Sequence, residues 1–338
     1  MNSISSQIPV PATKSATGLG GFRGKGYRVR VILFLYELFV KFINISDRIG
    51  GPVLLEGITF FWFLVDLSKR WHDYPRFAQL HNLRPPAFWK GTGPFRHYLQ
   101  MIWSWLLTCT TVLVYSRLGL PHWKKRFKTS GTSPQALPEW GARPVILAFL
   151  HVGAFPLIPL WLRSLGIPAG SVVGGLPLLA QNNEFRKMMA EGDSRYGLHG
   201  TPLTFSRSGP AVRAAFRFLK PGNILTIALD GGRLSTEHDA YDAGGFTFFA
   251  KQGASRIAAQ TNAILMPVLI HSTGRLRFHI RFGTPVPDEL LRKDDFKAAT
   301  QHLVTELWKE IREHPTSVAW TAMEGYAPEL RGKKPGWP

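Results

Sequence analysis

One histidine, His151, stands where a parallel sheet presents catalytic groups. It directly follows the apolar run Pro144–Leu150, which has the length and composition of a buried strand. Ligands and catalytic side chains of open α/β sheets gather at the carboxyl ends of the strands. A neutral imidazole in such a place can take a proton from a hydroxyl group. His151 is therefore a candidate general base, and the alternative interpretation is a structural histidine that caps the strand end.

An aspartate and a glycine pair follow a second apolar run in the same way. Asn223–Leu229 predicts a strand, and Asp230, Gly231, Gly232 and Arg233 come directly after it. Glycines permit positive φ angles and a close approach of the backbone to a ligand. An aspartate at a strand end can orient a base or bind an acceptor group. The alternative is an ordinary Gly-Gly turn in which the aspartate is a local cap.

Two further cationic residues are candidates for binding an anionic substrate. Arg207 lies in the segment Thr204–Gly209, before a basic helix, where a guanidinium can hold a phosphate or carboxylate by two hydrogen bonds. Lys251 lies in the glycine-containing segment Gly244–Ala254. A solvated arginine and ordinary helix–sheet packing are the alternative interpretations of these two segments.

Several other chemistries lack their motifs. The chain contains no GxxxxGK[ST], no GxGxxG after a strand, no GxSxG and no HExxH. The histidines after position 151 have no metal-ligand spacing, and Cys109 is the only cysteine, which argues against a disulfide framework and a cysteine-based zinc site. We therefore expect neither a metal ion nor a resident cofactor.

The second half of the chain alternates between short apolar runs and helical patterns. Strands are predicted over Pro144–Leu150, Asn223–Leu229, Ile264–Ile270 and Leu276–Phe282, and helices over Glu184–Met189, Gly209–Leu219, Phe248–Thr261 and Phe296–Glu313. Such alternation predicts an α/β domain with a mostly parallel central sheet surrounded by helices. We assign this domain to residues 131–325, followed by a tail over residues 326–338.

The first half of the chain does not show this alternation of strand and helix patterns. Residues 1–26 are rich in Ser, Gly, Thr and Pro and predict a flexible tail, and residues 27–130 contain three apolar, aromatic runs: Val29–Ile45, Val53–Leu67 and Tyr98–Tyr115. The third run is uncharged over 18 residues, which is near the lower limit for a membrane span. It is compatible with a buried core helix, an interfacial helix or a true span. We expect residues 27–130 to form amphipathic, membrane-associating helices.

The charge of the chain points to an anionic partner. The 338 residues carry a formal net charge of +19. Residues 1–140 hold 18 Lys+Arg and 6 Asp+Glu, or +12, together with seven of the 11 Trp residues. A nucleic-acid binder places its cations on a solvated polar face, whereas these cations border long apolar runs. The pattern favours an anionic membrane surface over nucleic acid, and it does not indicate an oligomeric state.

The order of these segments resembles the lysophospholipid acyltransferase superfamily, and most of all its bacterial lipid A (lauroyl/myristoyl) acyltransferase branch. The resemblance covers about residues 95–325 and rests on four blocks in the family's order, namely His151, Phe205-Ser206-Arg207, Asp230-Gly231-Gly232-Arg233 and Pro267. It implies an α/β fold on the cytoplasmic face of the inner membrane, monotopic or with one N-terminal anchor.

The resemblance also implies a reaction. An acyl chain passes from a thioester, acyl-ACP or acyl-CoA, to a hydroxyl or amine of a lipid or glycolipid, with His151 as the general base. Arg207, Arg233 and Lys251 would bind phosphate, and amides near Gly231 and Gly232 would hold the oxyanion. The expected partners are thus membrane lipids and an acyl carrier protein or coenzyme A thioester.

One departure from the family bears directly on the base. The family has an acid five residues after the histidine, where this chain has Pro156, and no carboxylate occurs between Glu139 and Glu184. Such an acid orients the imidazole and stabilises its charged form. We predict that Asp230 takes this role, with Glu184, Asp193 or a backbone carbonyl as alternatives. The alternative function is a catalytically degenerate relative that binds lipid or a partner enzyme.

Overall fold

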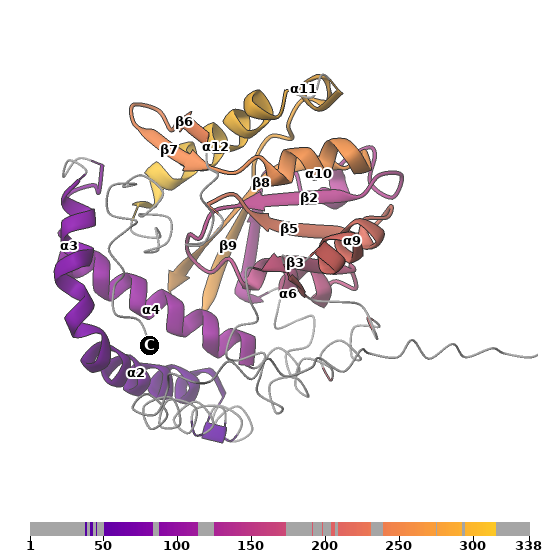
Figure 1. Ribbon diagram of the computed structural model, residues 1–338. Helices are drawn as coiled ribbons and strands as arrows, with labels where there is room; N and C mark the ends of the chain where they lie inside the picture. Colours follow the sequence, from indigo (N-terminus) through magenta and orange to yellow (C-terminus); the bar gives the residue numbers. More distant parts are fainter. Residues whose placement is uncertain are drawn as a thin grey trace, which may run out of the picture.

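A seven-stranded sheet forms the centre of the protein in a computed structural model (Figure 1). The structure describes residues 38, 41–42, 45, 51–83, 88–113, 125–173, 191, 198, 204–206, 209–230, 239–274, 276–292 and 295–315. The strand order is β1-β9-β8-β2-β5-β3-β4, and a separate two-stranded hairpin consists of β6 and β7. Only β8 and β9 pair antiparallel within the large sheet, while its other neighbouring strands are parallel. The predicted α/β class with a mostly parallel sheet is confirmed.

Helices α2 to α4 come first along the chain, and strands and helices are interspersed after them. The strands are β1 Phe127–Ser130, β2 Val145–Phe149, β3 Ala169–Val173, β4 Thr204–Ser206, β5 Ile224–Ala228, β6 Asp239–Asp242, β7 Thr247–Ala250, β8 Ile264–Gly274 and β9 Arg277–Phe282. The helices are α2 Gly51–Arg70, η1 Trp71–Asp73, α3 Tyr74–Asn82, α4 Pro94–Leu113, η2 Pro134–Ala136, α6 Leu157–Ser164, α9 Gly209–Phe218, α10 Gly253–Thr261, α11 Asp288–Arg292 and α12 Phe296–Glu313.

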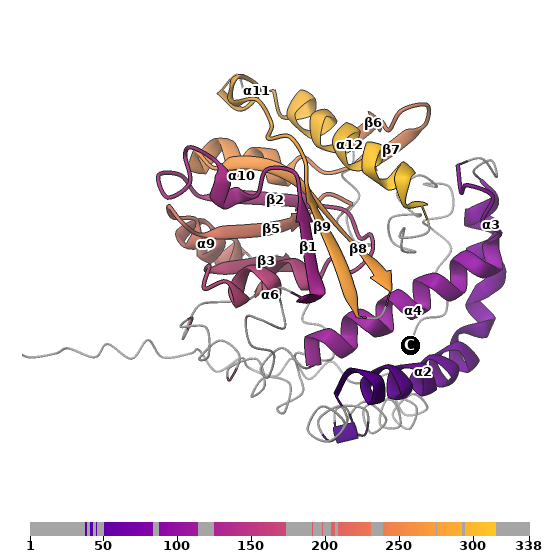
Figure 2. The same ribbon diagram turned by 180° about the vertical axis from the view of Figure 1, so that it is seen from behind.

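Both faces of the sheet are covered, which explains the continuous apolar runs of its central strands. Every residue of β2 is buried. Ile146 and Ala148 face one hydrophobic cluster, which includes residues of α3, α9, α10 and α12, and Leu147 and Phe149 face a second cluster, which includes residues of α6. Figure 2 shows β1 beside β9, where β1 is the terminal strand of the sheet.

The N-terminal helices form an arc along one side of the sheet (Figures 1 and 2). α2 packs on α4 through the Thr59 and Thr110 hydroxyls, which lie 2.9 Å apart, and through the rings of Phe63 and Trp103. α4 supplies Ile102 to one hydrophobic cluster and Leu107 to the other. The Tyr98–Tyr115 run thus forms a core helix over much of its described length. None of the helices in the described ranges is long and apolar enough to cross a membrane.

The structure corrects one prediction and shifts a boundary. Phe248–Ala250 is not the start of a helix but strand β7, because Gly244 and Gly245 adopt positive φ angles in the turn that pairs β7 with β6. α10 begins only at Gly253. β1 belongs to the sheet, so the sheet begins on the N-terminal side of the boundary we drew at residue 131. The tails, Glu184–Met189 and most of Val29–Ile45 lie outside the described residues.

Candidate active site

The register of two parallel strands places His151 opposite Asp230. Phe149, the last residue of β2, pairs with Ala228, the last residue of β5. His151 and Asp230 each lie two residues further on, so they leave the same edge of the sheet side by side. The Leu229 amide continues the pairing by donating to the Phe149 carbonyl at 2.8 Å. The predicted juxtaposition of the histidine and the aspartate is confirmed.

Asp230 contacts His151 through both of its carboxylate oxygens. Its Oδ1 lies 2.7 Å from the ring nitrogen Nδ1, and its Oδ2 accepts a hydrogen bond from the backbone nitrogen at 2.9 Å. The Asp230 side chain is 0% exposed, whereas the His151 side chain is 22% exposed. A buried carboxylate needs such hydrogen-bond donors. Burial also strengthens the electrostatic attraction between the Asp230 carboxylate and a charged imidazole.

This pairing assigns roles to the two ring nitrogens. A carboxylate that accepts from Nδ1–H fixes the tautomer in which Nε2 carries the lone pair. Nε2 is then the basic nitrogen of the ring, and Asp230 stabilises the imidazolium that forms when Nε2 takes a proton. The arrangement is compatible with a general base and its orienting acid.

The turn after His151 is held in place by strand β8. Gly153 has φ +59°, and a Cβ atom there would lie 2.0 Å from the Ile270 carbonyl oxygen. The neighbouring Ala154 amide donates to that same oxygen at 3.3 Å. Only glycine tolerates both the left-handed conformation and this close approach. The position of the turn therefore depends on a residue without a side chain.

Two phenylalanines pack against the His151 ring. The Phe155 ring lies 4.7 Å from the imidazole in an edge-on arrangement, and the Phe149 ring lies 6.0 Å from it. The two phenylalanine rings stack on each other at 5.3 Å. Sequence analysis missed both residues, although they bracket His151 closely in the chain. Aromatic packing of this kind limits rotation of the imidazole.

Pro156, which stands where the resemblance implies an acid, directly precedes the helix that follows the turn. It is the N-cap of α6, and its φ of −63° suits the start of a helix. Asp230, from the adjacent strand, is the carboxylate that contacts the ring. Of the other predicted acids, Glu184 and Asp193 lie outside the described residues.

Lys251 lies at the same edge of the sheet as the histidine and the aspartate. Its backbone nitrogen donates to the Leu229 carbonyl at 2.9 Å, so its backbone is next to the residue that precedes Asp230. The other predicted substrate-binding residues, Arg207, Gly231, Gly232 and Arg233, lie outside the described residues.

The described part of the chain contains no cluster of three His, Cys, Asp or Glu residues arranged to hold a metal ion.

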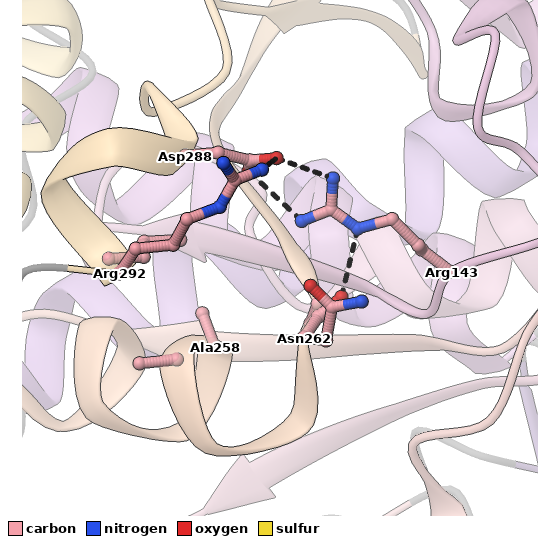
Figure 3. Close-up of a pocket in the computed structure, with 8 residues that line it drawn as sticks. Arg143, Ala258, Asn262, Asp288 and Arg292 are labelled. Atoms are coloured by element: carbon pink, nitrogen blue, oxygen red, sulfur yellow. Dashed lines mark hydrogen bonds and ion pairs between the residues drawn. The ribbon is translucent and has the colours of Figure 1, made fainter.

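A small cavity of about 50 Å³ lies at the opposite edge of the sheet, beside the start of β2 (Figure 3). The Arg143 guanidinium there donates to both Asp288 oxygens, at 2.8 and 3.0 Å, and to the Asn262 carbonyl at 2.9 Å. These groups satisfy one another, so we interpret the cavity as structural.

No family model matches the chain, and no curated protein matches it.

Proposed function

We propose that this protein is an acyltransferase that moves a fatty acyl chain from acyl-ACP or acyl-CoA to a hydroxyl or amine of a lipid or glycolipid. The observation that carries the proposal is the contact between Asp230 and the Nδ1 atom of His151 at the carboxyl edge of the sheet. It supplies the orienting acid whose usual position is occupied by Pro156, and it favours an active enzyme over a degenerate relative. The four blocks in the family's order add to this argument.

The proposed step is a direct transfer between the two substrates. Nε2 of His151 takes the proton of the acceptor hydroxyl while the hydroxyl oxygen attacks the thioester carbonyl. The carbon–sulfur bond then breaks, and the imidazolium returns its proton to the leaving thiolate. The products are an ester and a free thiol. Asp230 stabilises the imidazolium between the two proton transfers.

The cations and glycines of the blocks have supporting roles in this proposal. Amides near Gly231 and Gly232 would hold the oxyanion of the tetrahedral intermediate. Arg207, Arg233 and Lys251 would bind the phosphate of the acceptor or of the donor's phosphopantetheine arm. No resident cofactor is needed, because the thioester is itself a substrate.

A set of exposed apolar side chains supports the membrane part of the proposal. We call it the apolar patch, and it comprises Phe42, Ile45, Leu54, Phe60, Phe61, Leu64, Trp71, Leu83 and Phe95. These nine are the large hydrophobic residues of the described ranges that are exposed, and all of them belong to the N-terminal helical region. Phe60 and Phe61, which are 54% and 60% exposed, lie with Leu64 on one stripe of α2.

Such a patch is costly in water and favourable at a bilayer surface. The surrounding segment is also the most basic part of the chain, so it complements anionic headgroups. We propose that the apolar patch lies in the headgroup region of the cytoplasmic face of the inner membrane. Monotopic attachment would keep the site beside its lipid acceptor.

The proposal is tested by acyl transfer in vitro. Purified protein is mixed with long-chain acyl-ACP or acyl-CoA and with vesicles that contain lysophospholipid or a lipid A precursor, and both thiol release and acylated lipid are measured. We expect transfer by the wild type and its loss in His151→Ala, with an unchanged circular dichroism spectrum. His302→Ala, which alters a histidine bonded to the Thr284 carbonyl, is the matched control.

Two results would contradict the proposal. Equal turnover by wild type and His151→Ala would exclude the base mechanism. Binding of the wild type to lipid vesicles, with no transfer from any of these donors, would favour the degenerate relative.

A further inference from the structure

Three histidine rings meet on strands β8 and β9 at the end of helix α12. His271 and His279 are cross-strand neighbours, and their rings lie 5.2 Å apart and nearly perpendicular. His314, directly after α12, stacks on His271 with a centroid distance of 3.9 Å. His314 is distant in sequence from the two strand histidines, so the contact joins the end of α12 to the antiparallel part of the sheet.

The central ring of this cluster is buried in its neutral form. His271 is 6% exposed, and its Nδ1 atom has no hydrogen-bond partner among the residues that the structure describes. Burial, together with repulsion from His314 and His279, lowers the pKa of His271 to about 4. Burial also lowers the pKa of His279 and of His314.

The charged groups around the cluster offset the charge of a protonated ring only in part, through Glu310 near His279 and Glu313 near His314. Arg281 on β9 and Lys128 on β1 face His279, and Lys90 and Arg281 face His314. The nearby carboxylates are already paired: Glu310 lies 2.7 Å from Arg281, and Glu313 lies 3.1 Å from Lys90. A proton added to the cluster therefore meets two other imidazoles and several cations.

Residues of β8 at the histidine cluster also contact the turn that follows His151. Ile270, which directly precedes His271, accepts the Ala154 amide through its carbonyl. A Cβ atom at Gly153 would lie 3.2 Å from the Cα atom of His271. The backbone that carries the histidine cluster is thus in contact with the turn that carries His151.

We propose that His271, His279 and His314 form an acid-sensitive latch, which holds the end of α12 on β8 and β9 at neutral pH and releases it in acid. Release would loosen β8 under the 151–154 turn and so reduce activity. This effect on activity rests on the proposed function, whereas the latch itself does not. The proposal gives the protein a way to respond to the pH near an anionic membrane, which is lower than that of the bulk solution.

The direction of the pH effect follows from linkage. The folded state keeps His271 neutral, while the unfolded chain binds a proton at its ordinary pKa of about 6.5. Stability contributed by the neutral cluster is therefore present above about pH 6.5 and is lost as the pH falls from there toward 4. Below about pH 4 the folded state is protonated as well, and the loss levels off.

The latch is tested by comparing the wild type with His271→Phe, which keeps an aromatic ring in the stack and removes the titratable group. We expect the melting temperature of the wild type to fall by about 4 °C more than that of H271F between pH 7 and pH 5. Protection of the amides in the last turn of α12, relative to the intrinsic exchange rate at each pH, should fall over the same interval in the wild type alone. His302→Phe, on the same helix, is the control and should behave as the wild type.

Two results would overturn the latch. One is parallel melting profiles of the wild type and H271F with unchanged amide protection in α12. The other is an NMR titration of the wild type in which the His271 ring protonates near pH 6.5, a measurement that holds even if H271F fails to fold. None of these readouts uses acyl transfer, so failure of the latch and failure of the proposed function can be told apart.

Discussion

Asp230 holds His151 at two points, with Oδ1 2.7 Å from the ring nitrogen and Oδ2 2.9 Å from the backbone nitrogen. The acid follows β5, the strand next to the one that precedes the base, and does not come from the helix that follows the base. A carboxylate orients an imidazole when it lies beside Nδ1, so the acid can come from any segment of the chain that reaches this position. The register of β2 and β5 provides that position.

Removing the charge of Asp230 should abolish most of the activity. Asp230→Asn keeps the size of the side chain, but its amide can donate to Nδ1 and favour the wrong tautomer, and it does not stabilise an imidazolium. We expect kcat for acyl transfer to fall by about 10³- to 10⁴-fold, with a small change in KM. Asp239→Asn, which alters an exposed carboxylate bonded to Gln252, is the control. A kcat for D230N within a factor of two of the wild type would contradict the assigned role.

The apolar patch should control membrane binding. Phe60 and Phe61 are more than half exposed, so replacing both by Ser removes apolar area that a bilayer would bury. We expect the double variant to bind anionic vesicles about 10- to 100-fold more weakly in a sedimentation assay. Lys297→Ser with Lys309→Ser, on exposed positions of α12, tests whether general charge is responsible. Equal losses in the two double variants would mean that the patch has no specific role.

The central part of the fold could be predicted because its strands are buried on both faces. Continuous apolar runs indicated the positions of β2, β5 and β8 to within a few residues, whereas β9, with the sequence RFHIRF, alternates between buried and more exposed positions. The proximity of His151 and Asp230 followed from the same reasoning, since parallel strands end at a common edge.

The short peripheral strands could not be predicted, because their residues carry little apolar signal. β3 has the sequence AGSVV and β4 the sequence TFS, and both become strands through pairing within the sheet. β7 was assigned to a helix because its apolar residues run into the helical segment that starts at Gly253. The packing of Phe155 on His151 depends on the Gly153 turn, which no periodicity encodes.

The Arg143–Asp288 pair should stabilise the opposite edge of the sheet in a pH-dependent way. The hydrogen bonds from Arg143 lower the pKa of Asp288, so its contribution is present above about pH 4 and is lost as the pH falls through the lowered value. Arg143→Lys loses the two-pronged contact, and we expect a loss of about 1 kcal/mol in urea unfolding at pH 7 after allowing for solvent screening.

The matched control for this pair is Arg292→Lys. Arg292 lies 3.6 Å from Asp288 with a largely exposed side chain, so its replacement should change stability by less than about 0.5 kcal/mol. The difference between wild type and R143K should shrink at pH 3. A difference that is constant from pH 7 to pH 3 would contradict the assignment to the charged pair.

The turn that carries His151 should be intolerant of a side chain at Gly153. Alanine there would be strained at φ +59° and would meet the Ile270 carbonyl, so Gly153→Ala should lower the free energy of unfolding by at least about 2 kcal/mol. Gly57→Ala is the control, because Gly57 lies within α2 with open space around its Cα, and alanine should raise stability by about 0.5–1 kcal/mol. If urea unfolding gave both variants wild-type stability or better, the turn would not depend on the contact with β8. If G153A folds with reduced stability and also loses acyl transfer, we attribute the loss of activity to a displaced His151.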